Sequence, residues 1–272
     1  MNQKILWDCH MHSSFSSDSS TPMECMIMQG ISNGLKGICF TEHFDPDYPK
    51  TPDGLNFALD IPLYMETFMS LKEKYHDAIE LRFGIELGLQ PHLKEHFDKL
   101  TSQYPFDFVI GSSHVVNGFD PYYPEFFHTR EESKAYREYF ESILENITKI
   151  SCIDTYGHLD YIVRYGPNKN RDYSYKKHAD IFDEILSQLI SRRIGMEVNT
   201  GGYHYGLGEP NPCTDIIRRY RELGGEIITV GADAHTPEKI GYAFDKAAEV
   251  LKECGFKYYT VFRKHEPEFL PL

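Results

Sequence analysis

The chain has 272 residues, of which 41% are hydrophobic, so it is long enough to bury one large core, and we expect one domain over residues 1–272. Its 41 acidic and 28 basic side chains leave a formal charge of −13, which repels polyphosphate backbones and anionic membranes. Nucleic acid and membrane are therefore excluded as expected partners. A small molecule that is partly cationic fits this charge better.

The cysteines indicate a reducing compartment. They are scattered, form no C-x-x-C pair and lie mostly in apolar surroundings, so we interpret them as reduced packing residues. They are Cys9, Cys25, Cys39, Cys152, Cys213 and Cys254. The first residues lack a basic start followed by a long apolar stretch, and no window reaches the ~18 apolar residues of a membrane span. We expect a cytoplasmic protein.

Short apolar or β-branched runs recur along the chain, and each is followed by a polar or glycine-rich turn and a segment with helical spacing. This alternation is typical of repeated β-α units, and seven units predict an α/β barrel. The predicted strands cover residues 5–12, 36–43, 80–89, 107–114, 154–160, 193–200 and 226–235.

Helix signals lie between these runs. Thr21 to Glu24 and Thr129 to Glu132 are interpreted as capping boxes, while Asn211 and Thr236 are interpreted as caps that precede proline at the first helical position. Three glycines supply predicted helix ends: Gly34, Gly224 and Gly255.

Three irregular stretches, 44–60, 115–128 and 199–211, are long for connections, and each follows the end of a predicted strand. In a parallel barrel the loops after the strands gather on one rim, where barrel enzymes carry their chemistry. We therefore expect these loops to surround the site.

Side chains that can bind metal recur at the carboxyl ends of the predicted strands. His10 and His12 are two residues apart, as are Asp233 and His235, so each pair faces one side of its strand. Imidazole suits zinc or iron, carboxylates can bridge ions, and nine such groups exceed the ligands of one catalytic ion. Two or three metals are therefore expected. The nine are His10, His12, Asp18, His43, Glu86, His114, His158, Asp233 and His235.

The motifs H-x-H, T-E-H, G-x-E, S-S-H, G-H-x-D, E-x-N-T and G-A-D-A-H occur in this order, and over nearly the whole chain they resemble the PHP (polymerase and histidinol phosphatase) family. More closely, the sequence resembles the monofunctional histidinol-phosphate phosphatases of that family. The resemblance implies a distorted (β/α)7, TIM-like barrel in a single domain and three divalent metal ions, zinc, iron or manganese. It also implies hydrolysis of L-histidinol phosphate in histidine biosynthesis.

The resemblance divides the nine ligands among three ions. The first ion would be held by His10, His12, Glu86 and Asp233. The second would be held by Asp18, His43 and His235, although some relatives have histidine at the position of Asp18. The third would be held by Glu86, as a shared bridge, with His114 and His158.

Clustered divalent ions suit phosphate-monoester hydrolysis because they lower the pKa of a bridging water and neutralise phosphoryl charge. We expect in-line attack by a hydroxide between the first two metals, without a side-chain nucleophile. Arg164 is the predicted phosphate clamp, because its planar guanidinium matches two phosphate oxygens and the resemblance supports this role. His204 is expected to donate to the phosphate or to the leaving oxygen. His204, Asp233 and a metal-bound water are the alternatives for the general acid.

A substrate that bears ammonium and imidazole groups needs further contacts. Asp160 or Glu209 is expected to meet its cationic groups, while Phe119, Tyr122 or Tyr123 packs against the ring. Cys9 and Cys39 border predicted ligands, but strand alternation turns both away from the histidine face.

Other functions share parts of this pattern. A different PHP phosphoesterase, acting on phosphotyrosine protein, a nucleotide or a nucleic-acid end, would have a similar metal core, although the net acidity disfavours polymers. A regulatory barrel would hold metal without turnover. An amidohydrolase-type barrel also opens with H-x-H but usually carries lysine at the end of its fourth strand, where this chain reads GSSHVV.

Overall fold

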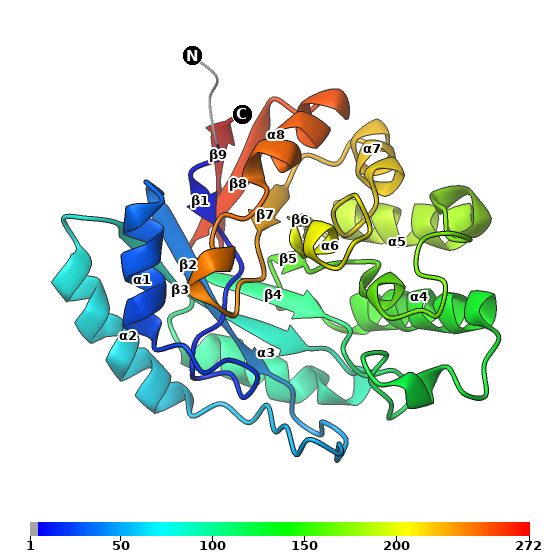
Figure 1. The fold of residues 1–272 in the computed structure, drawn as a ribbon, viewed down its shortest axis with the longest axis horizontal. Helices are drawn as coiled ribbons and strands as arrows, with labels where there is room; N and C mark the ends of the chain where they lie inside the picture. The colour runs from blue at the N-terminus through cyan, green and yellow to red at the C-terminus, as the bar shows by residue number, and fades with distance from the viewer. Residues whose placement is uncertain (1–4) are drawn as a thin grey trace.

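The computed structural model describes residues 5–272, whose main sheet contains seven parallel strands in chain order (Figure 1). They are β1 (Trp7–Asp8), β2 (Gly37–Phe44), β3 (Glu80–Gly88), β4 (Phe108–Ser112), β5 (Thr155–Tyr156), β6 (Gly195–Asn199) and β7 (Ile228–Gly231). A parallel bridge between Met11 and Ala234 joins the first strand to the last, which closes the sheet. The predicted distorted (β/α)7 barrel is confirmed. Each predicted strand is present, but β1 and β5 pair over only two residues.

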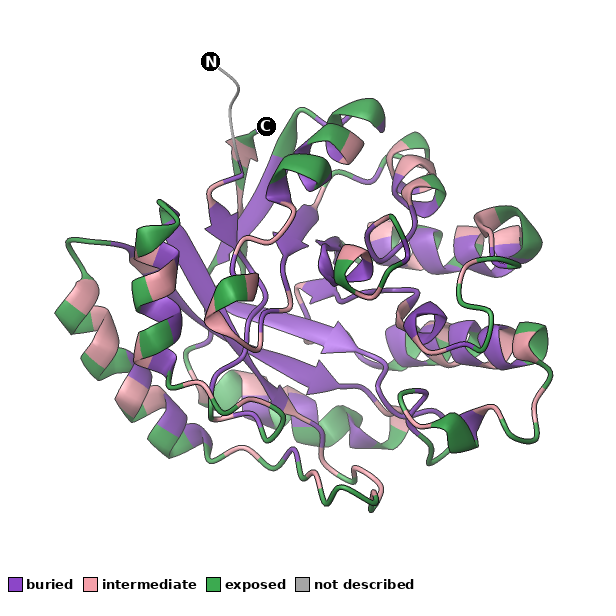
Figure 2. Ribbon diagram, viewed as in Figure 1, coloured by how far each residue is buried: buried purple, intermediate pink, exposed green. Residues whose placement is uncertain are grey.

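The helices lie around this sheet, and each α-helix has a buried side and an exposed side (Figure 2). The α-helices are α1 (Met23–Ser32), α2 (Ile61–Tyr75), α3 (Lys94–Gln103), α4 (Glu132–Lys149), α5 (Ala179–Ser191), α6 (Gly201–His204), α7 (Thr214–Glu222) and α8 (Phe244–Glu253). The 3-10 helices are η1 (Pro91–Leu93), η2 (Pro124–Phe126), η3 (Tyr161–Arg164), η4 (Tyr175–His178) and η5 (Pro237–Lys239). In α7, Ile216, Ile217 and Tyr220 form the buried face, as helical spacing requires.

The predicted starts of two helices are wrong in detail. The first residue of α1 is Met23, its N-cap residue is Pro22, and the hydroxyl of Thr21 donates to the carbonyl of His235 instead of capping the helix. The first residue of α4 is Glu132, so its start falls at the end of the predicted box, and no side chain caps it. At α1, the Thr21 hydroxyl that a capping box would use within the helix is hydrogen-bonded instead to a residue far away in the sequence.

The two predicted caps before proline have different outcomes. Asn211 does not cap a helix, because α7 begins at Thr214 and the Asn211 side chain bonds other side chains in the barrel. Pro237 does occupy the first position of a helix, the 3-10 helix η5, although Thr236 makes no capping hydrogen bond. The predicted helix ends are confirmed by positive φ angles of 73° at Gly34, 95° at Gly224 and 88° at Gly255.

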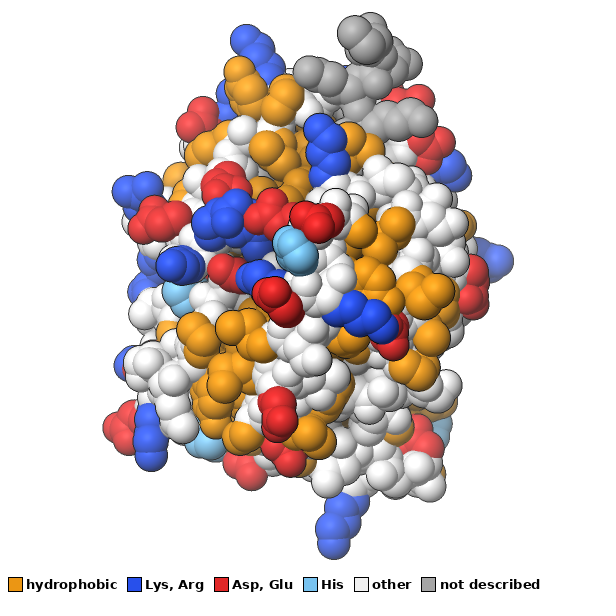
Figure 3. Space-filling model, turned by 90° about the vertical axis from the view of Figure 1, so that its left-hand side faces the viewer, with side chains coloured by type: hydrophobic (Ala, Val, Ile, Leu, Met, Phe, Trp, Pro, Cys, Tyr) orange, Lys and Arg blue, Asp and Glu red, His pale blue; other side chains and the backbone are white. Residues whose placement is uncertain are grey.

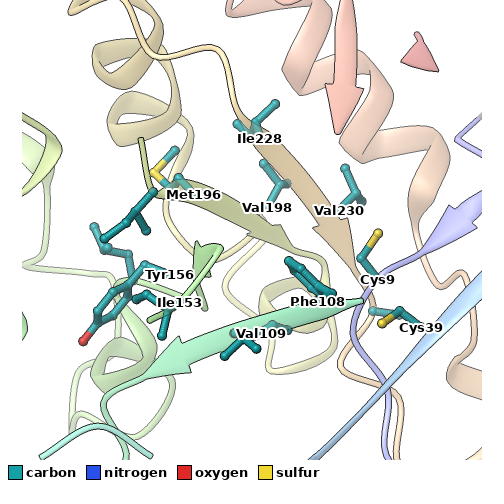
Figure 4. Close-up of a cluster of buried hydrophobic side chains, with 14 of the residues drawn as sticks. Cys9, Cys39, Phe108, Val109, Ile153, Tyr156, Met196, Val198, Ile228 and Val230 are labelled. Atoms are coloured by element: carbon teal, nitrogen blue, oxygen red, sulfur yellow. The ribbon is translucent and has the colours of Figure 1, made fainter. Parts of the chain in front are cut away.

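The barrel core confirms the packing role of two cysteines. Cys9 and Cys39 lie among apolar side chains of β4, β6 and β7, such as Phe108, Val198 and Val230 (Figure 4). All six cysteines are free thiols. Cys25 is exposed, however, so the packing interpretation is wrong for that residue.

A C-terminal hairpin was not predicted. It consists of the antiparallel strands β8 (Tyr258–Arg263) and β9 (Glu266–Pro271), and it packs against the starts of the barrel strands. The hydroxyl of Thr260 accepts from the backbone N–H of Ile228 at 3.1 Å, and Phe262 stacks on Phe108 with 5.2 Å between ring centroids. The hairpin thus covers the amino end of the barrel, opposite the ends that carry the predicted ligands.

The molecular surface on the side of α1 and α2 mixes acidic, basic and apolar side chains (Figure 3). Met28, Leu63 and Met69 are the large exposed apolar residues of these two helices. Within residues 5–272, no helix has the length and apolar character required to cross a membrane.

Candidate metal centre

The nine predicted ligands meet at the carboxyl ends of the strands. His43 and Glu86 belong to β2 and β3, and the others lie in the segments that follow β1, β4, β5 and β7. Three of them, His10, His12 and Glu86, have no exposed surface. Parallel strands bring residues that are more than 200 positions apart in the sequence to one rim.

Four donors surround one point between β1, β3 and β7. The Nε2 atoms of His10 and His12 are 3.1 Å apart. Glu86 Oε2 lies 3.3 Å from His10 Nε2 and 3.6 Å from His12 Nε2, and Asp233 Oδ1 lies 3.6 Å and 3.4 Å from the same two nitrogens. This is the set that the resemblance implied for the first ion.

Two smaller groups flank it. Asp18 Oδ2 lies 3.4 Å from His43 Nε2 and 3.1 Å from His235 Nε2. The other oxygen of Glu86, Oε1, lies 3.4 Å from His114 Nε2 and 3.0 Å from His158 Nε2. The two oxygens of Glu86 therefore face different groups, as a bridging carboxylate would.

The donors fit divalent ions by spacing and by chemistry. Atoms that bind one tetrahedral zinc ion at about 2.0–2.1 Å lie about 3.3 Å from one another, which the observed separations match. Glu86 Oε2 is buried without a hydrogen-bond partner, although His43 Nδ1 lies 2.9 Å away, because the two atoms are not aligned for a hydrogen bond. A buried carboxylate oxygen that faces imidazole nitrogens without hydrogen bonds is a donor suited to a cation.

The distances do not divide the predicted ligands into three separate sets, as the resemblance does. His12 also groups with His43 and His235, and His43 groups with Glu86 and His114. Donors that belong to more than one group indicate ions a short distance apart.

Residues behind the imidazole rings fix the nitrogens that face the centre. His10 Nδ1 bonds Glu197 Oε1 at 2.6 Å, and His114 Nδ1 bonds Asp45 Oδ1 at 2.7 Å. Because Nδ1 is engaged, Nε2 of each ring is left free for a metal. Sequence reasoning missed Glu197 and Asp45 as functional residues. The E-x-N-T motif was a signal for Glu197, whereas Asp45, two residues after His43, had none.

The local electrostatics set the charge of three of the predicted ligands. Burial lowers the pKa of His12, and neighbouring His43 and His235 lower it further, so its ring stays neutral and can coordinate. Burial opposes the ionised form of Glu86, but the surrounding histidines, His10 first, hold its pKa well below its usual range. The pKa of Asp233 is held well below its usual range in the same way, again against burial and chiefly by His10. Both carboxylates are therefore anionic.

Arg164 lies beside this centre and is almost fully buried. Its guanidinium donates to Asp233 Oδ2 at 3.0 Å, to Asn199 Oδ1 at 2.8 Å and to Asn211 Oδ1 at 2.8 Å. These bonds use three of its five N–H groups, and two are left for a ligand. Asp233 thus faces the histidines with Oδ1 and the guanidinium with Oδ2.

A cavity of about 270 Å³ opens onto the centre. Its lining combines predicted metal ligands and Arg164 with aromatic side chains, namely Tyr48, Phe57, Tyr122, Tyr161, Tyr165 and Tyr205. This size suits a small molecule and not a polymer chain.

Of the residues predicted to contact the substrate, some line the cavity and others do not. Tyr122 lines the cavity, but Phe119 and Tyr123 do not. Asp160 is buried below it and accepts from Asn211, Tyr173 and the backbone of Cys213. The predictions for these residues did not allow for the local partners that occupy them.

Two more predicted residues lie outside the main cavity. Glu209 accepts from the first backbone N–H of α7, that of Thr214, so it acts as a helix cap. His204 is exposed and its Nδ1 contacts Lys239 Nζ at 2.7 Å, in an adjoining depression that shares Asp233 and His235 with the main cavity.

A closed parallel barrel with buried histidines and carboxylates at the carboxyl ends of its strands, beside a small cavity, defines a class: barrel enzymes that use divalent metals. Comparison with known proteins narrows this class. The model of the PHP domain matches residues 8–201, and the chain belongs to the PHP family.

Among curated proteins, the chain is 32% identical to the histidinol-phosphatase of Lactococcus lactis subsp. lactis over 256 residues, which are 94% of this chain and 93% of that protein. It is 31% identical to a probable histidinol-phosphatase of Clostridium acetobutylicum, over 93% of this chain and 95% of that protein. Among solved structures, the L. lactis histidinol phosphate phosphatase, complexed with zinc, L-histidinol and phosphate, matches with a TM-score of 0.90 and 30% identity. That match covers 97% of this chain and 99% of the other.

Proposed function

We propose that this protein hydrolyses L-histidinol phosphate to L-histidinol and phosphate, as a step of histidine biosynthesis. The observation that carries the proposal is that one cavity is lined by metal donors, by Arg164 and by aromatic rings. The metal donors and Arg164 suit a phosphate ester, and the aromatic rings suit an imidazole ring. Similarity over nearly the full length to a histidinol-phosphatase supports the same substrate.

We propose three divalent ions, each zinc, iron or manganese, held by the nine residues in the division that the resemblance implied. Bound divalent ions would supply an acidified water and neutralise the charge that develops on the phosphoryl group. Support comes from the three neighbouring donor groups, from the bridging position of Glu86 and from the zinc in the L. lactis structure.

The remaining steps fall to groups of this chain. The two free N–H groups of Arg164 bind and orient phosphate oxygens. The guanidinium is held in place for this by its three hydrogen bonds to Asp233, Asn199 and Asn211. Asp233 borders both the first donor group and Arg164, so we assign to its carboxylate the transfer of a proton from the attacking water to the leaving oxygen. His204 is the alternative donor from the adjoining depression.

We propose one PHP domain for residues 1–272, beyond the matched 8–201, because Asp233 and His235 follow β7 and complete the ligand set. We also place the protein in the cytoplasm. Its six free thiols and its biosynthetic relatives support that location.

The test is phosphate release by protein reconstituted with zinc, iron or manganese. L-Histidinol phosphate is compared with phosphotyrosine, a nucleoside monophosphate and phenyl phosphate at equal concentrations. We expect kcat/KM for L-histidinol phosphate to exceed the others by at least tenfold. Equal turnover of all four substrates would contradict the proposal and indicate a different phosphoesterase.

Arg164→Ala tests the phosphate contact separately from the metals. Arg164 contacts Asp233 but is not itself a predicted metal ligand, so the variant should keep its metal content. It should bind inorganic phosphate at least tenfold more weakly. Metal content is measured by atomic emission and phosphate binding by product inhibition. Unchanged phosphate inhibition would remove Arg164 from the mechanism.

A further inference from the structure

Asp120 is a buried carboxylate on the cavity wall that the metal groups do not use. It is 6% exposed, it lines the same cavity as Arg164, and it belongs to none of the donor groups. The other two carboxylates that line this cavity, Asp18 and Asp233, both contact predicted metal ligands. Asp120 therefore faces the space that a substrate would fill, and no predicted metal site neutralises the charge of its carboxylate.

Two loops hold this carboxylate in place. The hydroxyl of Tyr48, from the loop after β2, donates to Oδ2 at 2.5 Å, and the backbone N–H of Tyr122 donates to Oδ1 at 2.7 Å. Each carboxylate oxygen can accept a second hydrogen bond. Both partners are neutral, and neighbouring His114 pairs with Asp45 instead.

A carboxylate that is buried with neutral partners alone carries a large desolvation cost, which a cation from a ligand relieves. Tyr48 and Tyr122 lie beside it in the cavity wall, and their rings can add a cation–π contribution. This part of the cavity lining is thus suited to positive charge as well as to an aromatic ring.

We propose that Asp120 binds the ammonium group of the substrate and so determines specificity for amino-alcohol phosphates. This inference rests on the proposed function and refines it, because L-histidinol phosphate carries a primary ammonium group on the carbon next to the one that bears the phosphate ester. Asp120 takes the role that the sequence suggested for Asp160 or Glu209, whose carboxylates have other partners.

The experiment measures ligand binding by calorimetry, so it does not depend on turnover. The metal-loaded enzyme is titrated with L-histidinol and with 3-(imidazol-4-yl)propan-1-ol, which lacks only the amino group, in the presence of inorganic phosphate. The wild type is compared with Asp120→Asn, which keeps the size of the side chain and loses its charge. Asp53→Asn is the matched control, because Asp53 accepts from Tyr123 on the same pair of loops but is exposed and does not line the cavity.

We expect the wild type and Asp53→Asn to bind L-histidinol at least tenfold more tightly than the deamino alcohol. In Asp120→Asn this preference should fall by about 10–100-fold, as for the loss of a charge-assisted hydrogen bond. The ratio of the two Kd values is the readout, since a merely structural defect weakens both ligands alike.

Two results would overturn the inference: a preference that is preserved in Asp120→Asn, including parallel weakening of both ligands, or equal binding of both ligands by the wild type. A failure of the proposed function has a different signature. In that case the wild type would release phosphate from L-histidinol phosphate no faster than from phenyl phosphate, whatever the ratio of Kd values.

Discussion

Glu197→Gln is the sharpest test of how the metal centre is held. One oxygen of Glu197 accepts from His10 Nδ1 at 2.6 Å, and the other accepts from the backbone N–H of His158 at 2.8 Å and from Asn199 Nδ2 at 3.1 Å. The side chain is 1% exposed, so water does not replace lost partners. Glutamine has the same shape but only one accepting oxygen.

Either orientation of the glutamine amide leaves a conflict. If its oxygen faces His10, its NH2 group faces two donors, and if it is turned round, the NH2 group forces His10 to carry its proton on the nitrogen that faces the metals. Losing a hydrogen bond to a charged group costs about 1.5–3 kcal/mol. At about 1.4 kcal/mol per tenfold, this predicts a 10–100-fold loss of metal affinity.

Competition with a chelating dye measures this affinity, and circular dichroism checks the fold. Glu145→Gln removes the same charge from an exposed position on α4 and should leave the affinity unchanged. Metal affinity within twofold of the wild type in Glu197→Gln would refute the argument that Glu197 sets the protonated nitrogen of His10.

Three further outcomes are expected. Gly201→Ala should lower kcat/KM at least tenfold at unchanged metal content, because the added Cβ would lie 2.8 Å from Asn199 Oδ1 and 3.1 Å from Arg164 Nη2. Full activity would show that the guanidinium can move freely. Chelation should lower the melting temperature of the wild type by several degrees, reversibly, whereas Glu86→Ala should bind little metal and show a much smaller change. Burial lowers the pKa of His178, so at this residue the unfolded chain takes up more protons, and the contribution of His178 to stability should fall as pH drops below about 6.5. Urea denaturation compares the wild type with His178→Phe, and an equal change of stability with pH in both would contradict this.

The candidate metal ligands could be selected from the sequence because several of them carry a local signature. His10 and His12, like Asp233 and His235, have the two-residue spacing of a strand, and each follows an apolar run that the barrel buries. The substrate contacts were not predictable in the same way. Asp160 and Asp120 are both aspartates near strand ends, and only the folded chain shows that Asn211 and Tyr173 occupy the first while the second lies open to the cavity.

From the sequence alone, the seven β-α units and the rim at which the candidate ligands meet were predictable, because period-two alternation and apolar runs act over a few residues. Tertiary structure alone decided that Glu197 orients His10, that Asn199 and Asn211 hold Arg164, and that a C-terminal hairpin covers the amino end of the barrel. These contacts join residues far apart in the chain, so their partners are chosen by the closure of the barrel and not by neighbouring sequence.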